Sequence, residues 1–87
     1  MTIKHFAKAI PNQVRKLLLE NEIISKAVPV ADNTEMKFLL KVWHNYIEPN
    51  KEISNCPICI GNILTNFKQM LEVLIELEKE QQYLKNL

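Results

Sequence analysis

The side chains with the most reactive chemistry are two cysteines three positions apart, Cys56 and Cys59, separated by Pro57 and Ile58. A Cys-x-x-Cys pair at a helix start becomes a redox-active dithiol when the helix N-terminus lowers the pKa of one thiol. The same spacing also supplies two of the four ligands of a tetrahedral zinc site. Thiol redox chemistry and zinc binding are therefore the two reactive interpretations of this segment.

A zinc site needs two further ligands, and the chain has only two histidines. His44 precedes Cys56 across a predicted loop, so the candidate metal ligands are Cys56, Cys59 and His44. The fourth ligand would be His5 or a cysteine of a second chain.

A third interpretation needs neither metal nor redox chemistry. Cysteine is among the most buried residue types, and both thiols would then pack against Trp43 and Tyr46. We prefer this packing from the sequence, with no cofactor and with a zinc site or an optional disulfide between Cys56 and Cys59 as the alternatives.

Other catalytic chemistry finds few suitable residues. The chain contains two serines, one aspartate and two histidines, and no short motif places a nucleophile beside a base. Its single glycine, Gly61, excludes the P-loop and the dinucleotide fingerprint, which need several glycines. We therefore expect a protein that is not an enzyme.

Charge is balanced overall but unevenly distributed. The formal net charge is +1, which argues against a global nucleic-acid footprint and against an acidic nucleic-acid mimic. The N-terminal part carries a basic edge, defined here as Lys4, Lys8, Arg15 and Lys16. The C-terminal part carries an acidic ridge, defined as Glu72, Glu76 and Glu80. We expect both to bind partners, either each other or another molecule. Nucleic acid at the basic edge is an alternative.

The elements that position these groups are all predicted to be helical. Apolar residues recur three and four apart, which is the helical period, and prolines at positions 11, 29, 49 and 57 interrupt the pattern. The predicted helices cover about 2–10, 11–27, 33–47 and 57–85. We expect a single all-α domain over 1–87, a small bundle of three to four helices with a long amphipathic C-terminal helix.

The last predicted helix carries an apolar seam with heptad spacing: Ile60, Ile63, Phe67, Met70, Leu74, Leu77 and Leu84, with Gln81 as its one polar member. At about 1.5 Å per residue the helix is roughly 43 Å long. A compact chain of this size is only about 30 Å across. The end of the helix must therefore project, fray or pack on something else. We expect Leu74, Leu77 and Leu84 to bind another protein, a ribonucleoprotein or a second copy of the chain. Gly61, inside this helix, is expected to permit close approach of another backbone.

The longest apolar runs are three residues, far shorter than a membrane span or the core of a signal peptide. We expect no membrane partner and an intracellular, cytoplasmic location; the resemblance given next implies that the cell is a bacterial host.

Two stretches of the chain resemble known proteins. Cys56-Pro57-Ile58-Cys59 resembles the glutaredoxin active site over four residues, without the βαβ pattern that would surround it. Over about 34–70, the order of Trp43-His44-Asn45-Tyr46, Pro49-Asn50 and the Cys-x-x-Cys segment resembles small phage and mobile-element proteins. That resemblance implies a phage-type role: a virion or packaging accessory, a transcription modulator or an inhibitor of a host defence nuclease. We expect a protein-binding module, such as an anti-CRISPR-type inhibitor. The alternatives are a zinc-stabilised nucleic-acid-binding or packaging accessory and a thiol redox protein.

Overall fold

The computed structural model describes residues 3–53 and 55–85. These residues are all-α, as predicted, and contain no strand. The elements are α1 (Ile3–Ala9), α2 (Asn12–Glu20), α3 (Ile23–Lys26), α4 (Thr34–Val42), the π-helical turn η1 (Trp43–Ile47) and α5 (Pro57–Lys85). Position 2, which the prediction included in the first helix, lies outside the described residues.

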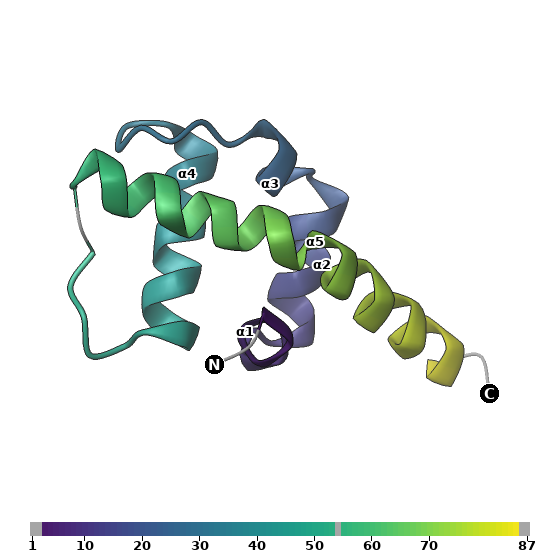
Figure 1. Ribbon diagram of the computed structural model, residues 1–87. Coiled ribbons are helices and arrows are strands. Elements are labelled where there is room, and N and C mark those ends of the chain that lie inside the picture. Colours follow the sequence, from purple (N-terminus) through teal and green to yellow (C-terminus); the bar gives the residue numbers. More distant parts are fainter. Residues whose placement is uncertain (1–2, 54, 86–87) are drawn as a thin grey trace.

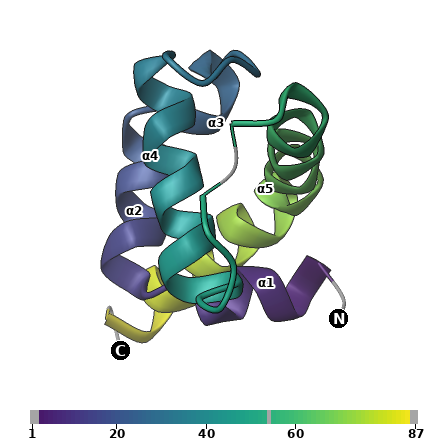
Figure 2. The ribbon, with the colours of Figure 1, turned by 90° about the vertical axis from the view of Figure 1, so that its left-hand side faces the viewer.

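The long helix α5 lies along one side of the molecule, and the shorter helices cover its inner face (Figure 1). In the view turned by 90°, α2 and α4 stand opposite α5, and α1 crosses beneath them (Figure 2). The molecule measures 45 × 25 × 18 Å. Its long dimension matches the roughly 43 Å expected for the 29 residues of α5.

A single apolar cluster holds these helices together. Its fully buried side chains come from every layer, including Ile10 after α1, Leu18 of α2, Met36 of α4 and Phe67 of α5. Trp43 joins three elements, because its ring centroid lies 5.2 Å from Phe6 of α1 and 5.8 Å from Phe67 of α5. The core therefore depends on contacts between the two ends of the sequence.

The predicted helix over 11–27 is broken in two by the backbone at Glu22. This residue has φ 52° and ψ 38°, a left-handed conformation that is uncommon for a residue with a Cβ atom. The turn redirects the chain so that Ile24 of α3 enters the core with 1% exposure. Glutamate is a good helix former, so local propensity could not indicate the break.

The predicted helix over 33–47 begins with a side-chain cap. Oδ1 of Asn33 accepts hydrogen bonds from the backbone N–H of Met36 (2.9 Å) and of Val28 (3.1 Å). It therefore joins the start of α4 to the loop that precedes it. The helix ends in the π-helical turn η1, where the N–H of Glu48 donates to the carbonyl of Trp43 over 2.9 Å.

Gly61 does not have the role predicted from the sequence. A Cβ atom built at this position would have nothing within 4 Å, so no other backbone approaches it. The expectation of a close helix contact at Gly61 was wrong. Gly61 lies in the second turn of α5, and no neighbouring segment needs the space that a side chain would occupy there.

Candidate functional site

The first candidate site lies where α5 begins. The carbonyl of Cys56 accepts the N–H of Ile60 over 3.0 Å, which makes Cys56 the N-cap residue of α5. The pKa of the Cys56 thiol is lowered because its sulfur accepts hydrogen bonds from the backbone N–H of Cys59, from that of Ile58 and from the Cys59 thiol. The helix N-terminus thus stabilises the negatively charged form of Cys56.

Both cysteines are solvent-exposed thiols. The prediction that they pack against Trp43 and Tyr46 was therefore wrong. The core-facing position of the first turn of α5 belongs to Ile60, which is 1% exposed. Trp43 uses its rings for Phe6 and Phe67 instead.

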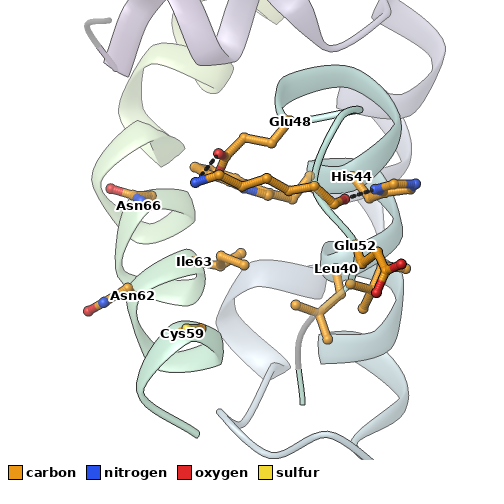
Figure 3. A pocket seen from close by; sticks show the side chains of 11 residues that line it. Leu40, His44, Glu48, Glu52, Cys59, Asn62, Ile63 and Asn66 are labelled. Atoms are coloured by element: carbon orange, nitrogen blue, oxygen red, sulfur yellow. Dashed lines mark hydrogen bonds and ion pairs between the residues drawn. The ribbon is translucent and has the colours of Figure 1, made fainter. Parts of the chain in front are cut away.

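A pocket of about 270 Å³ lies beside Cys59. One wall comes from α5, with Cys59 and Ile63 facing Leu40 and His44 on the opposite wall (Figure 3). The loop between η1 and α5 closes the pocket at its edge with Glu48, Lys51, Glu52 and Ile53.

Two hydrogen bonds and one ion pair order this loop. Glu48 accepts the indole N–H of Trp43 at 2.7 Å on one carboxylate oxygen, and its other oxygen lies 2.9 Å from Nζ of Lys51. These hydrogen bonds, that of Lys51 first and that of Trp43 second, lower the pKa of Glu48. Nδ1 of His44 lies 2.6 Å from the carbonyl oxygen of Lys51 (Figure 3). A carbonyl only accepts, so Nδ1 of His44 is the donor of this hydrogen bond.

The three predicted metal ligands do not come together. Within residues 3–53 and 55–85, no three His, Cys, Asp or Glu side chains are grouped closely enough to hold a metal ion. His44 and Cys59 lie on opposite walls of the pocket. A zinc site built by Cys56, Cys59 and His44 of one chain is therefore not formed.

The second candidate site is the C-terminal part of α5. Leu74 is 0% exposed and belongs to the core, so its predicted role as a partner-binding residue is wrong. Leu77 is half-buried against the same core, whereas Leu84 is 62% exposed. Gln81, the polar member of the seam, accepts a hydrogen bond from Nδ2 of Asn12 over 3.3 Å. The seam thus meets the start of α2 at Gln81 and leaves the fold at Leu84.

The acidic ridge and the basic edge do not meet within the chain. Glu72, Glu76 and Glu80 are exposed on α5, and Lys4 and Lys8 are exposed on α1. In the described part of the chain the ion pairs are Lys16–Glu20 and Lys51–Glu48. Arg15 instead donates to the carbonyl of Ala7 over 3.3 Å and so links α2 to α1. Among the described residues, the ridge and the basic edge therefore form no ion pair with each other.

Sequence reasoning missed a groove of about 380 Å³ between α2–α3 and the C-terminal half of α5. Its apolar lining includes Leu19, Ile24, Leu71 and Ile75, and Ile75 is 39% exposed. Leu71 and Ile75 lie one turn apart, beside the heptad seam. This spacing was the one feature of the sequence that indicated a groove here, and it does not show which helix forms the opposite wall.

By length and composition alone, α5 is the one helix in the described residues that is long and apolar enough to cross a membrane. A helix that provides the core of a soluble protein passes the same test, and α5 packs its apolar face against α1 to α4.

The fold and these two ends of α5 define a small all-α protein with exposed functional groups at each end of one long helix. No protein family, no curated protein and no solved structure matches the chain. Its function must therefore be inferred from its own geometry.

Proposed function

We propose that this chain is a non-enzymatic protein-binding module that docks on a larger protein or ribonucleoprotein through the C-terminal end of α5. One observation carries the proposal. The apolar seam is completely buried at Met70 and Leu74 but continues to Leu84, which is 62% exposed. An amphipathic helix that extends past its own core is suited to lie in an apolar groove of a partner.

The neighbouring side chains support this surface. Tyr83 is 67% exposed and directly precedes Leu84 at the helix end, and aromatic residues are enriched in protein interfaces. The acidic ridge lies on the outer side of the same segment and can contribute a charged rim. A charged rim mainly controls the rate and specificity of association.

The resemblance to small phage proteins supports a narrower form of the proposal, in which the partner is a host defence nuclease and the module is an anti-CRISPR-type inhibitor. Inhibition would be steric or allosteric, since a net charge of +1 does not suit a nucleic-acid mimic.

The test compares the wild-type chain with the double variant Tyr83→Ser and Leu84→Ser as bait in extracts of the native host. The matched control is Val30→Ser, which changes another half-exposed apolar side chain (47%) outside α5, in the loop before α4. We expect a partner that binds the wild type and the control and is lost by the double variant. Circular dichroism should show the same helicity for all three proteins.

A partner that binds the double variant as well as the wild type would contradict the proposed surface. Light scattering on the purified wild type covers the case of self-association. A dimer that the double substitution dissociates would assign the surface to a second copy of the chain.

A further inference from the structure

The start of α5 carries a feature that protein docking does not use. Cys56 and Cys59 lie on the first turn of the helix, both exposed, with the Cys59 thiol donating to the sulfur of Cys56. Two accessible thiols in direct contact are the requirement for an intramolecular disulfide. They lie at the opposite end of α5 from Tyr83 and Leu84 (Figure 1).

The two sulfurs are not equivalent. Cys56 occupies the N-cap, where its sulfur accepts the N–H groups of Ile58 and Cys59. Donors fixed by the helix favour the thiolate of Cys56 without any change in the backbone. Cys59 lies inside the first turn and lines the pocket beside Lys51. Cys56 is thus the sulfur whose thiolate the helix start stabilises, and Cys59 is the sulfur next to it.

A positively charged side chain, that of Lys51, lines the same pocket as Cys59. The pKa of Lys51 is raised by its hydrogen bond to Glu48 and by the charge of Glu48. Because Glu48 binds Lys51 at 2.9 Å, this charge is held near the pocket.

We propose that Cys56 and Cys59 form a reversible dithiol–disulfide site in which Cys56 is the attacking thiol and Cys59 the resolving thiol. The oxidant is a low-molecular-weight disulfide such as oxidised glutathione. Cys56 thiolate attacks one sulfur of that disulfide, the bond between its two sulfurs breaks, and one glutathione leaves as a thiolate.

The second step closes the cycle. Cys59 loses its proton to solvent and attacks the sulfur of Cys56, the mixed disulfide breaks, and the second glutathione leaves. Two protein thiols are oxidised to one disulfide, and one glutathione disulfide is reduced to two thiols. A reversible pair of this kind is the form that disulfides usually take in reducing compartments.

The test treats the reduced wild-type protein and two single variants with oxidised glutathione and follows the products by mass spectrometry. We expect the wild type to lose two hydrogen atoms and retain no glutathione. Cys59→Ser should accumulate one glutathione adduct at Cys56, because no resolving thiol is present. Cys56→Ser should form its adduct more slowly, by roughly tenfold, because Cys59 lacks the N-cap position.

Three outcomes would overturn the proposal. Two stable glutathione adducts on the wild type would show that the thiols do not reach each other. Equal reaction rates of the two variants would remove the distinction between attacking and resolving thiols. Metal analysis of untagged protein that finds one zinc ion per two chains, with both thiols protected from glutathione, would assign the pair to a shared zinc site. Because Cys56 and Cys59 are exposed, both variants should keep the wild-type circular dichroism.

Discussion

The indole N–H of Trp43 donates a hydrogen bond of 2.7 Å to the carboxylate of Glu48, five residues further along the chain. Trp43 is 7% exposed and contacts both Phe6 and Phe67, so this bond joins the aromatic centre of the core to the loop that borders the pocket. The second carboxylate oxygen of Glu48 binds Lys51, which lines the same pocket as Cys59. The hydrogen bond between Trp43 and Glu48 therefore links the packing of the core to the pocket that Cys59 lines.

The variant Glu48→Gln tests this connection through pH. It keeps an oxygen for Trp43 but removes the charge that pairs with Lys51. Because the Lys51 side chain is 76% exposed and solvent screens this pair, we expect a loss of no more than about 1 kcal/mol in the free energy of unfolding near neutral pH. The pKa of Glu48 is lowered in the folded protein by Lys51 and then Trp43, from an ordinary value of 4.5. Its contribution is therefore complete above that value and is lost as the pH falls through the folded pKa.

Urea unfolding followed by circular dichroism measures this effect. The difference between wild type and Glu48→Gln should stay constant from about pH 7 to pH 6 and decrease toward pH 3. A difference that is the same at both ends of this range would show that the charge of Glu48 does not stabilise the fold.

Leu74 and Leu84 occupy the same seam of α5 and should respond differently to truncation. Leu74→Ala removes a side chain that is 0% exposed, so we expect a loss of about 3 kcal/mol in the free energy of unfolding. Leu84→Ala changes a side chain that is 62% exposed and should alter stability by less than about 0.5 kcal/mol. Thermal and urea unfolding of the two variants check this prediction, and equal losses would contradict the difference in burial between the two leucines.

Gly61→Ala should stabilise the protein. The position lies inside α5, and an added Cβ atom meets nothing within 4 Å. Alanine in a helix interior is more favourable for the free energy of folding than glycine by about 0.8–1 kcal/mol. The chief reason is that an unfolded chain with alanine has less backbone entropy to lose on folding. A rise of that size in the free energy of unfolding is expected. A decrease would mean that another segment approaches Gly61 in solution.

Glu22→Asn should also stabilise the protein, through the backbone. Glu22 has φ 52°, and asparagine occurs in this left-handed region several-fold more often than most residues with a side chain. We expect a gain of roughly 0.5–1 kcal/mol in the free energy of unfolding. The matched control is Glu76→Asn on exposed helical backbone, where the same change should cost about 0.5 kcal/mol. Losses at both positions would contradict a left-handed Glu22.

The sequence alone determined the class of fold and the course of the longest helix. Proline positions and the helical spacing of apolar residues predicted an all-α chain whose last helix covers 57–85, and α5 spans Pro57–Lys85. These features depend on local chemistry, because proline lacks an N–H and helical periodicity is visible in neighbouring residues. The position of Cys56 at a helix start was predicted for the same reason.

The tertiary structure decided which apolar helix faces are covered by other segments and which stay exposed. Leu74 and Leu84 are leucines of the same seam, yet Leu74 is buried and Leu84 is exposed. The reason is that α5 extends beyond the region that α1 to α4 cover. The cysteines were expected to be buried, but Ile60 takes the core-facing position and leaves both thiols in solvent. The break at Glu22 serves the burial of Ile24, a requirement that neighbouring residues do not show. Apolar periodicity states which face of a helix is apolar. Which segments cover that face depends on contacts between residues far apart in the sequence.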